Sequence, residues 1–221
     1  MRYPEVLRQL KRLGHDSFRL DGSPVIYIDP WKLGEDMPKA DLILITHDHY
    51  DHCSAEDIAK ISREGTVVIG NPGAAAQLGG ATRILHPGES LTVAGVTVTA
   101  FPAYNTNKFR SPGQPFHPQA AQGNGYIIRR NGETLYHAGD TDFIPEMSQL
   151  QVTVALLPVS GTYVMTADEA FEAAKLIKAD FYVPMHYGDI VGDQGDVEKF
   201  RYLCESQGLR VAVLSTSEDP T

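Results

Sequence analysis

The hydrophobic positions along this chain fall into many short runs and a few longer amphipathic stretches. Short runs of apolar and β-branched residues, bounded by Gly, Pro, Asn or Asp, are typical of strands. The pair Asn131-Gly132 between two such runs is a strong signal for a β-hairpin. We expect strands at residues 17–20, 25–29, 41–46, 66–70, 83–85, 90–94, 96–101, 125–130, 133–138, 152–157, 181–184 and 210–214.

Apolar residues at helical spacing predict four main helices. Ser54 is suited to cap the second of these, and Thr166 with Glu169 has the spacing of a capping box at the start of the third. A further short helix is expected after the polar loop at 139–142. The four helices are expected at residues 4–13, 55–61, 167–178 and 195–206.

Strands and helices alternate over the whole chain, and no linker or short repeat interrupts them. With 221 residues, the chain is long enough for one layered α/β domain, which we expect to span 1–221. Residues 102–123 form a polar, proline-rich segment that is expected to be a loop. Loops of this length in compact domains are usually functional or mobile, so this segment is a candidate part of a site.

The formal net charge is −9, and there is no run of Lys or Arg that could follow a phosphate backbone. We therefore expect a small-molecule substrate and no nucleic acid partner. The two cysteines lie far apart and form no disulfide framework, which suits a reducing compartment. No segment has the roughly 18 apolar residues of a membrane span, and the start lacks the apolar region of a signal peptide. The expected protein is cytoplasmic and has no membrane span, and whether it forms a homo-oligomer is left open.

Three histidines and a carboxylate in a run of six residues, His47, His49, Asp51 and His52, directly follow the strand expected at 41–46. Such a cluster is costly without a cation, and imidazole suits Zn, Mn, Fe or Ni. On an extended segment His47 and His49 point the same way and can share one ion, whereas Asp51 and His52 lie past a turn and can reach another. Two divalent ions at such a site activate a hydroxide at neutral pH. We expect two zinc ions, with Mn or Fe as alternatives.

Two further polar clusters, at 140–142 and 186–189, also follow apolar strands. Open α/β sheets commonly place their sites at the carboxyl ends of strands. The three clusters are therefore expected to form one site.

The segments 46–52, 137–142 and 185–188 resemble the motifs of the metallo-β-lactamase superfamily, and the resemblance covers essentially the whole chain. It implies an αββα sandwich of two mixed β-sheets flanked by helices, with a dinuclear site at the sheet edges. It also implies that Asp140 bridges the two ions and that His186 completes the second site. Within the superfamily, the chain is most similar to the branch that holds ascorbate-6-phosphate lactonases and N-acylphosphatidylethanolamine phospholipase D.

The third ligand of the first ion departs from the superfamily pattern, because Asn105 stands where a histidine is expected. His117 lies 23 residues before Asp140, close to the usual interval in the superfamily, whereas Asn105 lies 35 residues before it. An amide oxygen is also a poor zinc ligand beside imidazoles. We therefore choose His117.

The predicted activity is metal-dependent hydrolysis, in which a hydroxide bound to the two ions cleaves an ester, lactone or phosphodiester bond of a small molecule. Asp51 and Asp140 are the candidate catalytic residues, which orient the nucleophile or carry a proton away. The alternatives are a mononuclear-iron oxygenase acting on a sulfur compound and a nuclease. The complete set of expected ligands is His47, His49, Asp51, His52, His117, Asp140 and His186.

Other polar residues near the motifs have a possible role in supporting the metal ligands. His15 either supports a metal ligand or is an ordinary turn histidine, and His137 is expected to be structural or to support a ligand. The side chain of Asp48 should point away from His47 and His49, because successive side chains alternate on an extended segment.

Overall fold

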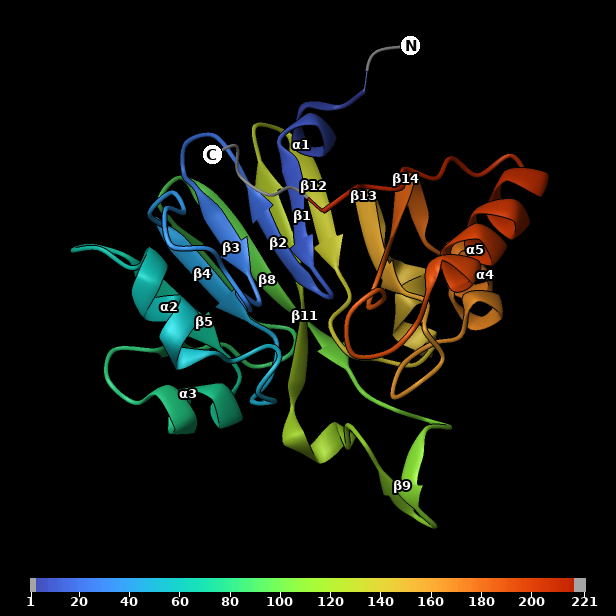
Figure 1. Ribbon diagram of the computed structural model, residues 1–221, viewed down its shortest axis with the longest axis horizontal. Helices are drawn as coiled ribbons and strands as arrows, with labels where there is room; N and C mark the ends of the chain where they lie inside the picture. Colours follow the sequence, from blue (N-terminus) through green and yellow to red (C-terminus); the bar gives the residue numbers. More distant parts are fainter. Residues whose placement is uncertain (1–2, 217–221) are drawn as a thin grey trace.

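Two six-stranded mixed sheets face each other in the computed structural model, which describes residues 3–216 (Figure 1). The strand order is β1-β2-β3-β4-β5-β6 in the first sheet and β14-β13-β12-β11-β8-β7 in the second. The first sheet comprises β1 (Leu10–Gly14), β2 (Ser17–Leu20), β3 (Ile26–Ile28), β4 (Leu42–Ile45), β5 (Val67–Gly70) and β6 (Arg83–Ile84). The second comprises β7 (Ser90–Val93), β8 (Val96–Ala103), β11 (Gly123–Arg130), β12 (Glu133–His137), β13 (Gln151–Pro158) and β14 (Lys178–Met185).

Helices cover the outer faces of both sheets, which confirms the αββα sandwich (Figure 1). Helices α2 and α3 lie beside the first sheet, and α4 and α5 lie beside the second. The helices are α1 (Glu5–Arg8), α2 (Ala55–Ile61), α3 (Pro72–Leu78), α4 (Ala167–Leu176) and α5 (Gln194–Ser206), with 3-10 turns at Gln119–Ala121 and Pro145–Gln149. None of the described helices is both long and apolar enough to cross a membrane.

Strand β4 is buried on both faces, because a hydrophobic core lies on each side of the first sheet. Leu42 and Leu44 belong to the core between the sheets, whereas Ile43 and Ile45 pack in a second core with residues of α2 and α3. A strand that is buried on both faces needs an unbroken apolar run, which is what this strand has.

The topology brings several chain segments to one edge of the sandwich. Strands β3, β4 and β5 are parallel, as are β12, β13 and β14, so their carboxyl ends lie at a common edge within each sheet. Because β2 is antiparallel to β3, the turn between β1 and β2 lies at the same edge as the end of β3. The hydroxyl of Tyr126 in β11 donates to the backbone oxygen of Ile45 at 2.7 Å and so links the two sheets near this edge.

The helix predicted at 4–13 is wrong in its second half. Helix α1 ends at Arg8, and Leu10–Gly14 is strand β1, in which Leu10 pairs with Leu20. Arg12 is buried and donates to the backbone oxygen of Tyr187 at 2.5 Å. Pairing with β2 and this distant contact outweigh the helical spacing of the leucines.

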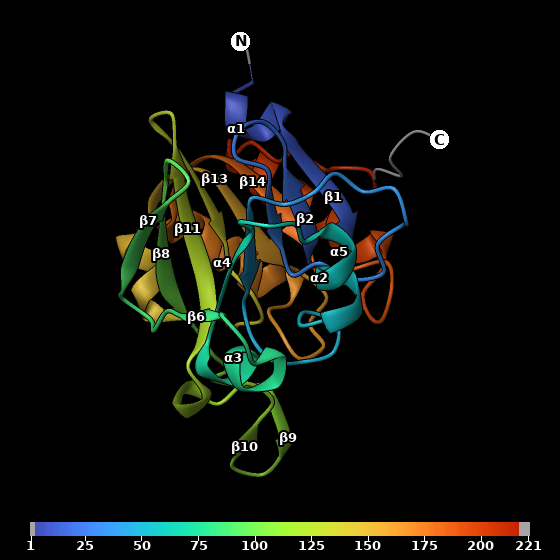
Figure 2. The same cartoon turned by 90° about the vertical axis from the view of Figure 1, so that its left-hand side faces the viewer.

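The structure differs from the sequence-based expectations in three other places. Helix α3, which Asn71 caps, was not predicted. The segment predicted as a strand at 210–214 forms only a single bridge, between Val211 and Tyr182. The predicted loop at 102–123 contains the small hairpin of β9 (Phe109–Ser111) and β10 (Gln114–Pro115), which projects from the sandwich (Figure 2). The expected single domain, 1–221, extends at both ends beyond the described residues.

Candidate metal centre

Histidines and carboxylates from distant parts of the chain converge in two groups at the edge described above. In each group, the candidate ligand atoms all lie within 4.8 Å of one another. The first group consists of His47, His49 and His117, and the second consists of Asp16, His52, Asp140 and His186. Six of the seven ligands predicted from the sequence are therefore in these groups, and Asp51 is the exception.

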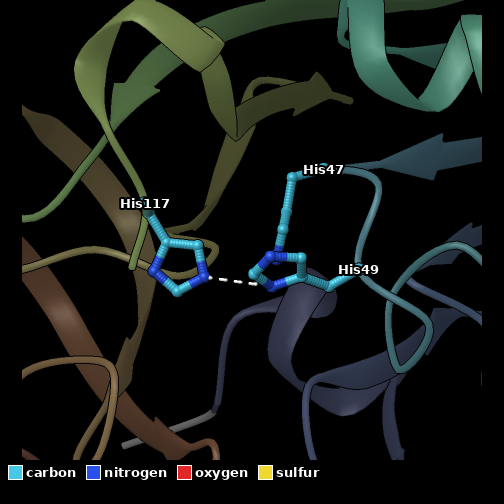
Figure 3. Close-up of side chains that lie close together, drawn as sticks. All are labelled: His47, His49 and His117. Carbon is cyan, nitrogen blue, oxygen red and sulfur yellow. Dashed lines mark hydrogen bonds between the residues drawn. The ribbon is translucent and has the colours of Figure 1, made fainter. Parts of the chain in front are cut away.

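In the first group, two histidines that directly follow β4 face a histidine from the segment after β10 (Figure 3). His117 Nε2 lies 3.3 Å from His49 Nδ1. Two imidazole nitrogens bound to one tetrahedral zinc ion would lie about 3.4 Å apart. The group therefore fits a divalent ion shared by three imidazoles.

The Nδ1 atoms of His47 and His117 have hydrogen-bond partners outside the group, so Nε2 is the nitrogen of each ring that can bind an ion. Thr46 Oγ1 lies 3.0 Å from His47 Nδ1, and Asn105 Oδ1 lies 3.0 Å from His117 Nδ1. Within the described part of the chain, His47 Nε2 is buried and has no hydrogen-bond partner. Metal-bound histidines almost always use the second nitrogen in this way.

Asn105 is a neighbour of a candidate ligand and does not itself join the group. Its Oδ1 accepts hydrogen bonds from the backbone amide of His117 at 2.8 Å and from the ring of the same residue. Its amide group donates to Asp142 Oδ1 at 3.1 Å and to the backbone oxygen of Tyr163 at 2.8 Å. His117 and Asn105 were the two candidates for the third ligand of the first ion. In the structure His117 lies in the group, whereas Asn105 binds the Nδ1 side of the His117 ring.

In the second group, two histidines are held with Nε2 directed at the same carboxylates. His52 Nδ1 bonds to Asp29 Oδ2 at 2.8 Å, and His186 Nδ1 lies 2.8 Å from Ser160 Oγ. His52 Nε2 is 3.4 Å from Asp140 Oδ1, and His186 Nε2 is 3.4 Å from Asp140 Oδ2. These separations also suit ligands of one divalent ion.

Asp140 connects the two groups. Its Oδ2 lies 3.3 Å from His117 Nε2 in the first group and 3.4 Å from His186 Nε2 in the second. It follows Gly139, whose φ of +64° turns the chain at the end of β12. A carboxylate in this position can contact an ion in either group.

Asp16 is the member of the second group that the sequence analysis missed. It lies in the turn between β1 and β2, is fully buried, and has Oδ2 at 3.7 Å from His52 Nε2 and 3.8 Å from His186 Nε2. Burial raises the pKa of its carboxyl to about 8. No local pattern marks this residue, and its only signal in the sequence is its position beside His15.

Asp51 lies at the border of the second group. Its Oδ2 is 3.6 Å from His52 Nε2 and 3.7 Å from His15 Nε2, and its side chain is 12% exposed. The ring of His15 packs on that of His186 with centroids 4.1 Å apart, so His15 supports the group and is more than a turn residue. The role of Asp51 as a ligand stays a prediction.

The electrostatic environments of the two groups differ. In the first, burial lowers the pKa of His117 to about 4 and that of His47 well below its usual value, which keeps both rings in the neutral form that binds metals. In the second, burial lowers the pKa of His186, but the neighbouring carboxylates of Asp140 and Asp16 have a larger, opposite effect. Together these effects raise the pKa of His186 from its usual value to about 9. A proton therefore occupies the second group when no cation does.

A pocket of about 390 Å³ opens onto both groups. Its volume suits a small molecule. Among the described residues that line it, Arg110 is the only Lys or Arg, and its guanidinium lies 5.4 Å from the centre of the Phe116 ring. The lining residues are His49, Tyr50, Asp51, Arg110, Phe116, His117, Asp140, Tyr163 and Ile190.

Comparison with known proteins identifies relatives over nearly the whole length of the chain. The beta-lactamase superfamily domain matches residues 9–186. A metal-dependent hydrolase of Pyrococcus abyssi is 36% identical over 228 aligned positions, covering 96% of this chain and 98% of that protein. A metal-dependent hydrolase of Methanoculleus marisnigri is 34% identical, with 95% of each chain covered. Among solved structures, the metallo hydrolase Igni18 of Ignicoccus hospitalis superposes with a TM-score of 0.76 at 27% identity, covering 95% of each chain.

Proposed function

Since the chain belongs to the metallo-β-lactamase superfamily and is a metal-dependent hydrolase, we propose that it uses two divalent ions to cleave an ester, lactone or phosphodiester bond of a small molecule. Zinc is the ion we expect, with manganese or iron as alternatives. The resemblance to lactonases and phosphodiesterases of the superfamily favours these bonds.

The position of Asp140 is the observation that carries the proposal. One of its oxygens lies 3.3 Å from His117 of the first group and 3.4 Å from His186 of the second. A buried carboxylate between two sets of imidazoles is stabilised when both sets hold cations. Three imidazoles in one group and two imidazoles with carboxylates in the other supply enough ligands for one ion each.

Two ions bound here would supply a hydroxide nucleophile at neutral pH and polarise the bond under attack. The residues of the chain position the reactants around them. Asp51 lines the pocket and is partly exposed, so its carboxylate can orient the attacking group or accept its proton. Asp140 also lines the pocket, and its Oδ2 lies within 3.4 Å of an imidazole nitrogen of each group.

Arg110 supports a substrate that carries a negative charge. It lies in β9 and lines the pocket, and within residues 3–216 no acidic side chain forms an ion pair with it. A guanidinium can bind a phosphate or carboxylate with two parallel hydrogen bonds. The aromatic and aliphatic side chains that also line the pocket suit an apolar portion of the same molecule; they are Tyr50, Phe116, Tyr163 and Ile190.

The proposal is tested by assaying the metal-loaded protein against a panel of small substrates. The panel contains bis-p-nitrophenyl phosphate as a phosphodiester, p-nitrophenyl acetate as an ester and a set of lactones. We expect turnover of at least one class, which is lost on chelation and restored by Zn²⁺ or Mn²⁺. The Asp140→Asn variant, which removes the charge between the groups, should lose at least a hundredfold in kcat/KM.

Two outcomes would overturn the proposal. The first is Asp140→Asn protein that binds both ions and retains full turnover. The second is purified protein with one iron ion per chain that consumes oxygen with a sulfur compound, since this is the behaviour of the alternative oxygenase.

A further inference from the structure

Asp16 is a fully buried carboxylate for which the described part of the chain provides no hydrogen bond. Both of its oxygens are without a partner there, and its side chain is 0% exposed. The turn between β1 and β2 brings it to the site, more than a hundred residues from Asp140 and His186 in the sequence. A buried charge without compensation is strongly unfavourable, so such a residue calls for a cation or a proton as its partner.

The surrounding atoms indicate a cation. Asp16 Oδ2 faces Nε2 of His52 at 3.7 Å and Nε2 of His186 at 3.8 Å, and both nitrogens are beyond hydrogen-bond distance. Both rings already use Nδ1, toward Asp29 and Ser160, so their Nε2 atoms point at the same space as Asp16. His52 Nε2 and Asp140 Oδ1 are likewise buried without hydrogen-bond partners among the described residues.

We propose that Asp16 is a direct ligand of the second ion, supplied from beneath the site by the turn between β1 and β2. This inference rests on the proposed function, because it assumes an ion in the second group. The second ion is then held from the protein interior by Asp16, while Asp51, at the pocket, is the carboxylate available to the substrate.

The ligand also changes the chemical character of the second site. The first group contains three imidazoles, whereas the second contains two imidazoles and two carboxylates, Asp16 and Asp140. Oxygen-rich sites suit harder ions such as manganese better than purely imidazole sites do. Removing Asp16 should therefore weaken the second ion and leave the first in place.

The experiment is a metal titration of the full chain after removal of all metal. Zn²⁺ is added to wild-type, Asp16→Asn and Asp16→Ser proteins, and the number of bound ions and their dissociation constants are measured by calorimetry and elemental analysis. We expect two ions in the wild type and an at least tenfold weaker second ion in both variants. The first dissociation constant should change less than threefold.

A matched control and a stability measurement separate a ligand from a structural residue. Asp48→Asn removes a carboxylate of the same motif that lies against Gly73 of α3 and is in neither group, so it should retain both ions. Compared well above pH 9, where His186 is neutral, metal-free Asp16→Asn should unfold at a temperature no lower than metal-free wild type, because it replaces a buried carboxylate without a hydrogen-bond partner by an uncharged amide. A structural role would instead lower the melting temperature of the metal-free variant.

Wild-type affinity for the second ion in either Asp16 variant would overturn the inference, and so would wild-type protein that binds only one ion. If the wild type binds two ions, the second of which depends on Asp16, but hydrolyses nothing in the substrate panel, the proposed function fails and the inference stands. If the variants keep both ions while the wild type is an active hydrolase, the inference fails and the proposed function stands.

Discussion

Asn105 holds His117 by two hydrogen bonds to a single oxygen. Its Oδ1 accepts from the backbone amide of His117 at 2.8 Å and from the ring Nδ1 at 3.0 Å. The first bond fixes the backbone of the loop, and the second fixes the ring so that Nε2 faces His49. Asn105 stands where the superfamily pattern has a histidine. It is thus a positioning residue for His117, the candidate ligand that replaces that histidine.

Asn105→Ala should weaken binding of the first ion by tenfold to a hundredfold, because partners of metal-bound histidines contribute about that factor. Zn²⁺ affinity measured in competition with a chelator tests this. Asn107→Ala is the matched control, since Asn107 lies in the same loop and its side chain donates to Glu169 and not to a histidine. Equal loss of affinity in both variants would show that the loop, and not the contact to His117, matters.

Arg110→Met should raise the KM for an anionic substrate by about 10- to 100-fold, because a charge-assisted hydrogen bond contributes about 1.5–3 kcal/mol. The KM for a neutral ester such as p-nitrophenyl acetate should stay within about twofold, because such a substrate has no charge for the guanidinium to bind. Arg129→Met, on β11 and outside the pocket lining, serves as the control. A parallel change in KM for charged and neutral substrates would contradict a role in charge recognition.

Metal binding should strengthen as the pH rises from 7 to 9. In the metal-free protein, burial lowers the pKa of His186 and the carboxylates of Asp140 and Asp16 raise it more, to about 9. The folded state therefore keeps a proton above pH 6.5 that the unfolded chain has lost. This proton stabilises the metal-free fold fully below pH 6.5, and the contribution is lost as the pH rises through 9.

A metal ion must displace that proton from His186, so the affinity should rise over this range, by about tenfold per pH unit for each proton that the ion displaces. Zn²⁺ titrations at pH 7, 8 and 9 measure the affinity, and the melting temperature of the metal-free protein should fall over the same range. An affinity that does not vary with pH would show that His186 is unprotonated in the metal-free protein.

Gly139→Ala should destabilise the metal-free protein by about 1–3 kcal/mol, the range for a residue forced into a disfavoured backbone conformation. Gly139 has a φ of +64°, and a Cβ there would lie 2.6 Å from the backbone oxygen of Asn124. Urea unfolding measures the loss. Gly34→Ala, where the space is open and φ is not in the left-handed region, should change the free energy of unfolding by less than about 0.5 kcal/mol.

The sequence is most informative where local signals and tertiary contacts agree. The apolar run of β4 predicts a buried strand that ends at the histidine cluster, and the structure confirms both the strand and its place at the site edge. Thr166 and Glu169 form the predicted capping box of α4. The turn Asn131-Gly132 joins β11 and β12 as expected.

The sequence is least informative where a distant partner decides the outcome. Residues 10–14 have helical spacing but pair with β2 as a strand. Asp16 joins the second group only because that pairing brings the turn to the site edge, and no spacing rule connects it with Asp140. Helix α3 was within reach of sequence analysis, because Asn71 and Pro72 are an ordinary cap and first helical residue.

The central claim is that the reaction requires both groups to hold an ion. The most direct measurement is turnover of the best substrate of the panel while Zn²⁺ is titrated into metal-free protein, with bound ions counted at each point. We expect little turnover up to one ion per chain and a steep rise between one and two. Full turnover at one ion per chain, or turnover without any metal, would contradict it.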